Sequence, residues 1–485
     1  IYAERYVSPS RHVEVQIFGD GNGRVVHFHE RECSIQRRHQ KIIEEAPSPS
    51  LDDATRTALH AAAVTAGQAI GYTNAGTVEF LLGATSRSPA EFYFLEVNTR
   101  LQVEHPVTEE VLGFDLVRLQ LEVAVGGAVP DQHEIGPVDG HAIEARLYAE
   151  DPTRDFLPST GRVLAFSVPD GVRLDTAIDA RGEVSRFYDP MMAKVIAKGP
   201  TRTAAARRLA AALAGTVVDG IVTNRDLLVR TLRHPEFLGD RGDSDFLIRN
   251  PPAELGRPLV EGHDLALSAA AAALAVQFER RAADRHTPAV TTGFRNVVTA
   301  PQRRSFTVDD RTVDVCYLFG RGRLVSLAVD GVELPNPRLL SGSVDLIDLE
   351  VDGIRRRFDV HIVDGHRRTV SVAGPAGAVT MTAEPRFAEP EARVDPGSTV
   401  ATMPGTIVSV NVEPGDSVTE GDVLLVMEAM KMELAIAATS PGVVSTVAVA
   451  AGDSVEAGAV LITVDEAETM ADEAEAGAGQ AGSGR

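Results

Sequence analysis

The sequence predicts an α+β protein of several domains, and three observations support this fold class. Its 485 residues suffice for about three to four domains of ordinary size. Alternating and helical patterns both occur in the first half, while residues 292–382 have the pattern of short strands separated by turns. Two segments near the C-terminus repeat one pattern 37 residues apart. Mixed domains are therefore expected first and strand-rich domains later.

The composition excludes several classes of protein. With 47 basic and 69 acidic residues, the net charge of −22 disfavours nucleic-acid binding, which depends on neutralising phosphates. Cys33 and Cys316 form no paired motif, which excludes a disulfide scaffold and a cysteine zinc site and favours the reducing cytoplasm. Neither a signal peptide nor a membrane-length apolar stretch is visible, so we expect no membrane partner.

The first 250 residues predict paired strands with helices between them. Residues 11–29 alternate around a glycine-rich turn at 19–23, which indicates a hairpin. Because no helix pattern follows those glycines, an ordinary turn is favoured over a phosphate-binding loop. Further expected elements are a capped helix at 52–70, strands at 76–82 and 92–97, and a helix near 114–124.

Pro-rich stretches divide the rest of the chain. Residues 251–262 indicate a linker before a long helix at 264–285, and the alternating strands that follow predict an antiparallel barrel or sandwich. Residues 384–396 indicate a tether, and the Ala-, Gly- and acid-rich end predicts a disordered tail. The expected divisions are 1–136, 137–250, 251–383, 384–397, 398–465 and 466–485.

Between the tether and the tail, one strand-turn-strand unit occurs twice. Pro404-Gly405 recurs as Pro441-Gly442, and Gly415-Asp416-Ser417-Val418 recurs as Gly452-Asp453-Ser454-Val455. Each copy is too small to bury its own apolar face, so the two are expected to pack as a flattened barrel. Chance similarity of two strand-rich stretches explains the matching turns poorly.

Lys431 stands between the two copies, in Glu428-Ala429-Met430-Lys431-Met432-Glu433, and is one of only four lysines. An ordinary exposed lysine is the plain alternative, but methionines beside it on a tight turn favour adaptable recognition. This motif within a twofold repeat resembles the biotinyl domain of biotin-dependent carboxylases, more closely than it does related lipoyl domains. The resemblance implies biotin in amide linkage to Lys431, attached by a biotin protein ligase.

A second polar run follows the expected strand at 92–97. It places Glu96, Asn98, Arg100, Gln102 and Glu104 at every second position, so on an extended strand they would share one face. This face could be an active-site wall or simply a solvated edge. Glu79 lies in apolar text, and carboxylates on neighbouring strands suit Mg²⁺.

These runs, with Arg31 to Lys41, resemble the biotin carboxylase family of ATP-grasp enzymes from Tyr2 to about Arg249. The resemblance implies that Glu104 deprotonates bicarbonate and that Arg146 stabilises negative charge developing on biotin. The other implied roles are bicarbonate binding by Lys41, Arg100, Gln102 and the backbone of Val103; Mg²⁺ (or Mn²⁺) binding by Glu79 and Glu96 with Asn98 beside them; and ATP binding by Glu4, His12, Gln36 and His39.

Other chemically interesting residues have simpler interpretations. His27-Phe28-His29-Glu30 could supply metal ligands, but strand alternation explains it better. Cys33 lacks an acyl-transfer constellation and is interpreted as an active-site neighbour or packing residue. Lys194 and Lys198 are interpreted as structural or surface strand residues.

The resemblance also has a gap: no Gly-rich phosphate loop of the ATP-grasp lid occurs. The chain begins at Ile1, and we expect it to be the C-terminal part of a longer protein that could not carry out ATP-dependent carboxylation as written. The long helix and following strands resemble the bridging domain of acyl-CoA carboxylase α subunits. Residues 253–395 are too few for a carboxyltransferase, which implies a separate β subunit.

Together these features predict a partial biotin carboxylase domain of the ATP-grasp type, a helix-plus-antiparallel-barrel bridging domain and a biotinyl domain. The expected function is ATP- and bicarbonate-dependent carboxylation of biotin on Lys431, for transfer to an acyl-CoA by the β subunit in a hetero-oligomer. Two alternatives are a carrier and assembly fragment that only presents biotin, and a non-biotin ATP-grasp ligase.

Overall fold

The computed structural model describes residues 6–83, 90–178, 182–239, 241–286, 300–309, 311–365, 367–385, 398–401, 403–429, 432–456 and 458–466, with Val290, Phe294 and Val297. Glu4 and Lys431, two of the predicted site residues, lie outside them. The chain forms two compact units, one of residues 1–184 and 191–385 and one of residues 185–190 and 386–485. Each unit is described by itself.

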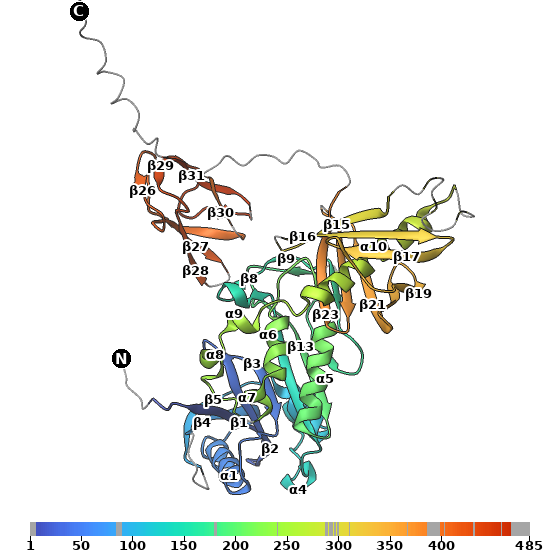
Figure 1. The fold of residues 1–485 in the computed structure, drawn as a ribbon. Coiled ribbons are helices and arrows are strands. Elements are labelled where there is room, and N and C mark those ends of the chain that lie inside the picture. Colours follow the sequence, from blue (N-terminus) through green and yellow to red (C-terminus); the bar gives the residue numbers. More distant parts are fainter. Residues whose placement is uncertain are drawn as a thin grey trace, which may run out of the picture. The chain divides into compact units, whose positions relative to one another are not determined.

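An eight-stranded antiparallel sheet forms the framework of the first 200 residues (Figure 1). The predicted hairpin is present: β1 and β2 are joined by a turn in which Asp20 accepts the N–H groups of Asn22 and Arg24. The strand order is β11-β13-β6-β3-β2-β1-β4-β5. The strands are β1 (Ser10–Gly19), β2 (Val25–Arg37), β3 (Gln40–Ala46), β4 (Asn74–Gly83), β5 (Phe92–Asn98), β6 (His141–Tyr148), β11 (Arg173–Thr176) and β13 (Met191–Gly199).

Alternation along β1 and β4 gives this sheet two different faces. Val13, Val15 and Ile17 form an apolar core with Leu59 and other residues of α1 (Asp53–Ala69). As predicted, α1 is capped, because Asp52 accepts the N–H of Thr55 at 2.7 Å. The intervening residues of β1 point to the opposite face, which carries the charged side chains described below.

The strand alternation predicted for His27 to Glu30 is confirmed from His27 to His29, and it fails at Glu30. The pairing of β2 with β1 shifts between the partners of Val15 and Ile17, and His29 has φ of 58°. This β-bulge inserts an extra residue and changes which face the following side chains occupy. Glu30 and His27 therefore both lie on the α1 side, whereas Arg31 lies on the charged side.

The strand predicted at 92–97 is present, and the polar run that follows it does not continue as an extended strand. β5 ends at Asn98, and residues 99–103 form a turn that leads into α2 (His105–Leu112) with Glu104 at its N-cap. Pro106 in the first turn favours a helix start at this point. α2, α3 (Leu116–Ala124) and α4 (Gln132–Ile135) follow, and Leu116, Leu119 and Ile135 pack on Phe18 and Phe28.

Helices α5 (Arg202–Gly215) and α6 (Arg225–Arg233) pack beside β6 and β13 around a second apolar core, which includes Leu147, Val195, Leu209 and Leu228. Short elements complete this region: β7 (Glu150–Asp151), η1 (Pro152–Arg154), β8 (Leu157–Pro158), β9 (Gly161–Arg162), β10 (Ala165–Ser167), β12 (Glu183–Val184), β14 (Val217–Asp219), α7 (Pro235–Leu238), α8 (Phe246–Arg249) and α9 (Pro252–Leu255).

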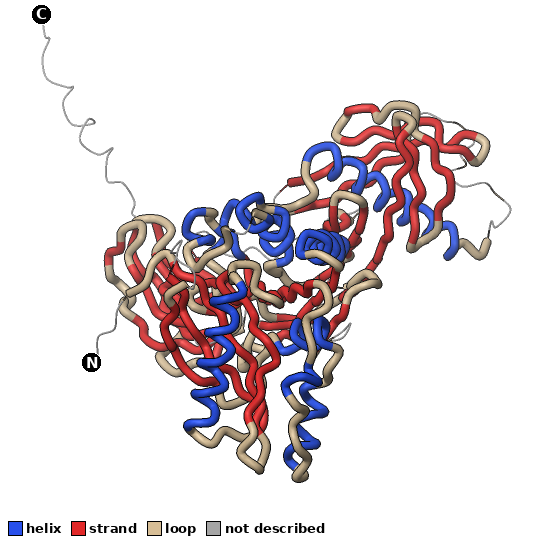
Figure 2. The backbone as a smooth tube through the Cα atoms, turned by 90° about the horizontal axis from the view of Figure 1, so that it is seen from below, coloured by secondary structure: helices blue, strands red, loops and turns tan. Residues whose placement is uncertain are grey.

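The predicted long helix is α10 (Gly262–Ala283), and it packs against a nine-stranded antiparallel sheet (Figure 2). All residues from Ala269 to Ala275 are fully buried, because alanine side chains let surrounding strands approach the helix closely. The described ladder ends at β18 and β19 without closing, although β17 contacts β19. The strands are β15 (Gln302–Val308), β16 (Arg311–Gly320), β17 (Arg323–Val329), β18 (Val332–Glu333), β19 (Arg338–Gly342), β20 (Leu346–Val351), β21 (Ile354–Val363), β22 (Thr369–Gly374) and β23 (Gly377–Ala383).

The described residues from 398 onward, here called the repeat domain, form two four-stranded sheets. Their orders are β24-β31-β29-β26 and β28-β27-β25-β30. The strands are β24 (Ser398–Val400), β25 (Gly405–Val410), β26 (Ser417–Val418), β27 (Val423–Ala429), β28 (Met432–Ala437), β29 (Gly442–Val447), β30 (Ser454–Val455) and β31 (Val460–Glu466).

The sequence repeat extends to the strand register of this domain. Ile407 pairs with Met427 in one copy, and Val444 pairs with Val464 at the equivalent positions of the other. The short strand of each copy pairs with a strand of the other copy: β26 of the first copy pairs with β29, and β30 of the second copy pairs with β25. The two copies thus exchange strands, as two units that cannot bury their own apolar faces require.

Among the described residues, no helix combines the length and the apolar character that crossing a membrane requires.

Candidate active site

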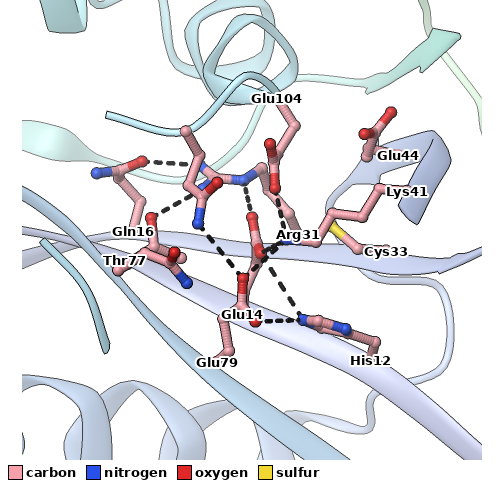
Figure 3. Close-up of polar contacts among 12 residues, drawn as sticks. His12, Glu14, Gln16, Arg31, Cys33, Lys41, Glu44, Thr77, Glu79 and Glu104 are labelled. Atoms are coloured by element: carbon pink, nitrogen blue, oxygen red, sulfur yellow. Dashed lines mark hydrogen bonds and ion pairs between the residues drawn. The ribbon is translucent and has the colours of Figure 1, made fainter. Parts of the chain in front are cut away.

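A buried group of charged side chains lies on the polar face of the eight-stranded sheet (Figure 3). The group draws on adjacent strands β1, β2, β3, β4 and β6 and on the N-terminus of α2. Its members are His12, Glu14, Gln16, Arg31, Lys41, Glu44, Thr77, Glu79, Gln102, Glu104, Thr108 and Arg146.

Arg31 holds the part of the group that lies on β1 and β4. Its guanidinium is fully buried, and Nε donates to Glu14 Oε1 at 2.6 Å. The other nitrogens donate to Gln16, Thr77 and Thr108 at 2.9–3.2 Å. A buried charge is tolerated only when it is paired and hydrogen-bonded, and these contacts meet that condition.

Lys41 gathers three carboxylates around one ammonium group. Nζ donates to Glu14 Oε2 at 2.5 Å, to Glu104 Oε1 at 2.6 Å and to Glu79 Oε1 at 2.9 Å. Burial alone would lower the pKa of Lys41, but the surrounding carboxylates, led by Glu14, raise it. For the carboxyl group of Glu14, burial alone would raise the pKa, but the charges of Lys41 and Arg31 lower it to about 2.

Glu79 links this arrangement to His12. Its Oε2 lies 3.1 Å from His12 Nε2, and its Oε1 accepts Gln102 Nε2 at 3.3 Å. Burial opposes ionisation of Glu79, but the bond with His12 and the charge of Lys41 outweigh it and lower the pKa to about 2. His12 Nδ1 in turn lies 2.9 Å from Gln36 Nε2, which brings two of the predicted nucleotide-pocket residues together.

Glu104 joins Lys41 to Arg146. This fully buried carboxylate accepts Lys41 on Oε1 and Arg146 on Oε2, the latter at 3.0 Å. Arg146 also donates to Glu44 Oε1 at 2.5 Å. Burial alone would lower the pKa of Arg146, but the charges of Glu44 and Glu104 raise it. The carboxylate of Glu104 is therefore fixed in place between Lys41 and Arg146, two cations that could bind an anion.

The predicted magnesium ligands lie on two paired strands, with Glu79 directly opposite Glu96. They differ in environment, because Glu79 is buried whereas Glu96 is exposed and accepts Asn98 Nδ2 at 3.1 Å. Among the described residues, two sets of side chains here gather closely enough for one ion: His12, Glu14 and Glu79, and Glu14, Cys33 and Glu104. The carboxylate oxygens in these sets suit Mg²⁺.

The five alternating residues of the polar run do not share one strand face, because the strand ends at Asn98. Arg100 is exposed, and its Nη1 donates to Gln102 Oε1 at 3.2 Å. Gln102 and Glu104 are buried and reach the group from the turn before α2. His39 is exposed in the turn between β2 and β3, at φ of 66°.

Sequence reasoning missed several members of the group. Glu14 and Arg31 lie within the hairpin, where their pairing depends on the strand register and not on any local motif. Lys194 lies on β13, as predicted, but its Nζ donates to the carbonyl of Val103 at 2.9 Å and pairs with Asp175 at 3.3 Å. Cys33 is buried beside the group as predicted, and burial raises the pKa of its thiol.

Four protein families match the chain in order. "Carbamoyl-phosphate synthase L chain, ATP binding domain" matches residues 1–132, and "Biotin carboxylase C-terminal domain" matches residues 144–249. "Methylcrotonyl-CoA carboxylase, alpha-subunit, BT domain" matches residues 263–386, and "Biotin-requiring enzyme" matches residues 395–464.

Individual relatives agree with these matches. The chain is 36% identical to the mitochondrial methylcrotonoyl-CoA carboxylase subunit alpha of Mus musculus, over 89% of this chain and 61% of that protein. Its identity to the mitochondrial propionyl-CoA carboxylase alpha chain of Caenorhabditis briggsae is also 36%, over 89% and 60%. A solved biotin carboxylase domain of a thermophilic 2-oxoglutarate carboxylase, bound to bicarbonate, is 36% identical with a TM-score of 0.50, covering 52% of this chain and 56% of that one.

The chain thus spans about three fifths of the length of the curated relatives that it matches. The four matches follow one another along the chain, and the solved structure supports the fold of the region that matches a biotin carboxylase. The chain therefore resembles, over 89% of its own length, the α subunits of acyl-CoA carboxylases.

Proposed function

We propose that the protein to which this chain belongs carboxylates biotin on Lys431, using ATP and bicarbonate, for transfer to an acyl-CoA by a separate carboxyltransferase β subunit. The observation that carries this proposal is the buried carboxylate of Glu104 between Lys41 and Arg146, at 2.6 and 3.0 Å. A carboxylate fixed in this way can accept a proton from a bound anion. The positive groups beside it can stabilise the negative charge of that anion.

In this proposal Glu104 accepts the proton of bicarbonate. Lys41, Arg100, Gln102 and the backbone N–H of Val103 bind the anion, and Lys194 positions Val103 through its carbonyl. His12, Gln36 and His39, with Glu4, contribute to the ATP pocket; the bond between His12 and Gln36 supports the first two. Glu79, Glu96 and Asn98 would hold Mg²⁺, which when bound neutralises phosphate charge.

Biotin, when attached to Lys431, supplies the ureido nitrogen that accepts the carboxyl group, and Arg146 stabilises negative charge near it. The lysine follows β27 and precedes β28, whose end residues Ala429 and Met432 pair with each other. We assign attachment to a biotin protein ligase and docking of the β subunit to the α10 region. The acyl-CoA belongs to the acetyl, propionyl, methylcrotonyl or long-chain class, and the proposed location is the cytoplasm.

Biotin attachment is tested by expressing the chain with a biotin protein ligase and blotting with streptavidin. We expect a signal from the wild type, no signal from Lys431→Arg, and an unchanged signal from Lys198→Arg. Lys198 is a suitable control because it lies on β13 of the eight-stranded sheet, outside the repeat domain, where it pairs with Asp139. A wild type without biotin would overturn the proposed carrier role and favour a non-biotin ATP-grasp ligase.

The role of Glu104 is tested in the full-length protein. Glu104→Gln is expected to lower bicarbonate-dependent ATP cleavage by about 10²–10⁴-fold, the range typical of losing a general base. Glu110→Gln, on the same helix, is the matched control and should retain activity. Activity retained in both variants would remove Glu104 from the base role. ATP cleavage that is absent even from the full-length wild type would favour the carrier fragment.

A further inference from the structure

Three histidines gather on the face of the sheet that is opposite the charged group. His27 and His29 come from β2, and His60 comes from α1, which covers this face (Figure 1). One ring nitrogen of each histidine lies within 4.8 Å of the other two. The rings of His27 and His60 stack with centroids 4.1 Å apart, and His29 meets each of them edge-on at 5.4 Å.

The β-bulge in β2 brings these residues together. His27 pairs with Ile17, whose side chain packs in the α1 core, so His27 lies on the α1 side. The left-handed φ of His29, 58°, is uncommon for a residue other than glycine and turns its ring toward the same group. The unpaired edge of β2 is held by Gln132, whose amide bonds the N–H and the carbonyl of His27, each at 2.9 Å.

Two of the rings have their outer nitrogens held by oxygen acceptors. His60 Nε2 lies 2.7 Å from Glu30 Oε2, and His29 Nε2 lies 2.9 Å from the carbonyl of Gly136. Because carboxylate and carbonyl oxygens only accept, both Nε2 atoms donate, and in a neutral ring Nδ1 is then the nitrogen that can bind another partner. Such outer bonds to carboxylate or carbonyl are typical of metal-ligating histidines. The ring of His27 is held less firmly than the other two, since its Nδ1 accepts only the His29 N–H, at 3.3 Å.

We propose that His27, His29 and His60 bind a divalent transition-metal ion, with Zn²⁺ as the best fit. Three imidazoles with one open position suit Zn²⁺, whereas Mg²⁺ prefers oxygen ligands. Rotation of the rings must bring the nitrogens closer, to about 2.0–2.1 Å from the ion. The ion would fasten β2 to α1, on the side of the sheet away from Lys41, so this proposal is independent of the proposed reaction.

The charges around the three rings favour this ion. Glu30, fully buried beside His60, adds a negative charge that is shared with Arg56 at 2.9 Å.

Equilibrium dialysis of the complete 485-residue chain against Zn²⁺, with millimolar Mg²⁺ present to occupy oxygen-rich sites, tests the proposal. The wild type should bind one Zn²⁺ more than His60→Gln, and the affinity of this site should fall by about 100-fold or more. His133→Gln is the matched control, because His133 is exposed on α4 beside the group and should leave binding unchanged. Equal binding by the wild type and His60→Gln, both folded by circular dichroism, would overturn the proposal.

A spectroscopic measurement does not depend on the folding of any variant. Cu²⁺ bound to the wild-type chain at one equivalent should show nitrogen hyperfine couplings from imidazoles in its electron paramagnetic resonance spectrum, since Cu²⁺ binds such sites at least as tightly as Zn²⁺. A spectrum with oxygen ligands alone would show that the three histidines only pack against one another.

Discussion

The eight-stranded sheet and the repeat domain are stabilised in contrasting ways. The polar face of the sheet depends on a few buried charges, in which Arg31 and Lys41 each contact several partners. The repeat domain, in contrast, depends on apolar strands such as β27 and β31, which occupy equivalent positions in two copies. Removing one charged residue should therefore harm the sheet more than removing one copy of a duplicated feature harms the repeat domain.

The largest effect is expected from Arg31→Met. This change leaves Glu14 buried with one cation fewer, and breaking a buried ion pair costs about 3–5 kcal/mol of the free energy of unfolding. Arg303→Met is the matched control, because Arg303 pairs with Asp314 at the surface, where such a pair contributes little to stability.

Hydrogen exchange of the amides of β1 and β2, followed with increasing urea, measures this difference within the sheet. Equal protection in the Arg31 and Arg303 variants would show that buried charges do not hold the sheet, and the contrast with the repeat domain would fail.

The next effect depends on pH and comes from a pair of buried carboxyl groups. Glu44 and Glu144 are directly opposite each other on β3 and β6, and within the described part of the chain both oxygens of Glu144 lack a hydrogen-bond partner. Burial raises the pKa of Glu144 well above its ordinary value, and Glu44 adds to this. Burial also raises the pKa of Glu44 to about 7. Lys194 and Arg146 oppose the shift of Glu144, and Glu104 adds to it.

A raised carboxyl pKa means that the folded state keeps a proton that the unfolded state has lost. The stability contribution of that proton is complete below the ordinary pKa of 4.5 and is lost as the pH rises through the folded pKa. Between pH 5 and pH 8 the wild type should therefore lose stability relative to Glu144→Gln. Urea unfolding at several pH values measures this, with Glu110→Gln as control. Parallel pH profiles for the wild type and Glu144→Gln would rule out the retained proton.

The same contrast explains what could be predicted from the sequence. The hairpin at β1 and β2, the capped α1 and the repeat all follow from spacing along the chain, which the local pattern records. The residues taken from the family motifs, such as Lys41, Glu104 and Arg146, also meet in one group, and their roles stay predictions.

Other features depend on strand register and on contacts between strands. The bulge at His29 is a change of register between β1 and β2, so the alternation of the sequence predicted the wrong face for Glu30. Likewise, alternation from Glu96 to Glu104 is satisfied equally by a strand end, a turn and an N-cap, because polar residues suit all three. The partners of Arg31 could be found only once the order of β1, β2 and β4 was known.

The smallest effect is expected in the repeat domain, at Gly415 and Gly452. These equivalent glycines have φ of 102° and 94°, and a Cβ added at either would meet no atom within 4 Å. Replacing either with alanine therefore costs only backbone strain, about 1–2 kcal/mol. Because their N–H groups donate to the equivalent residues Val444 and Ile407, both at 2.8 Å, the two costs should agree to within about 0.5 kcal/mol. Thermal unfolding of the two variants measures the costs, and clearly unequal values would show that the two copies, although equivalent in register, do not share the stability of the domain equally.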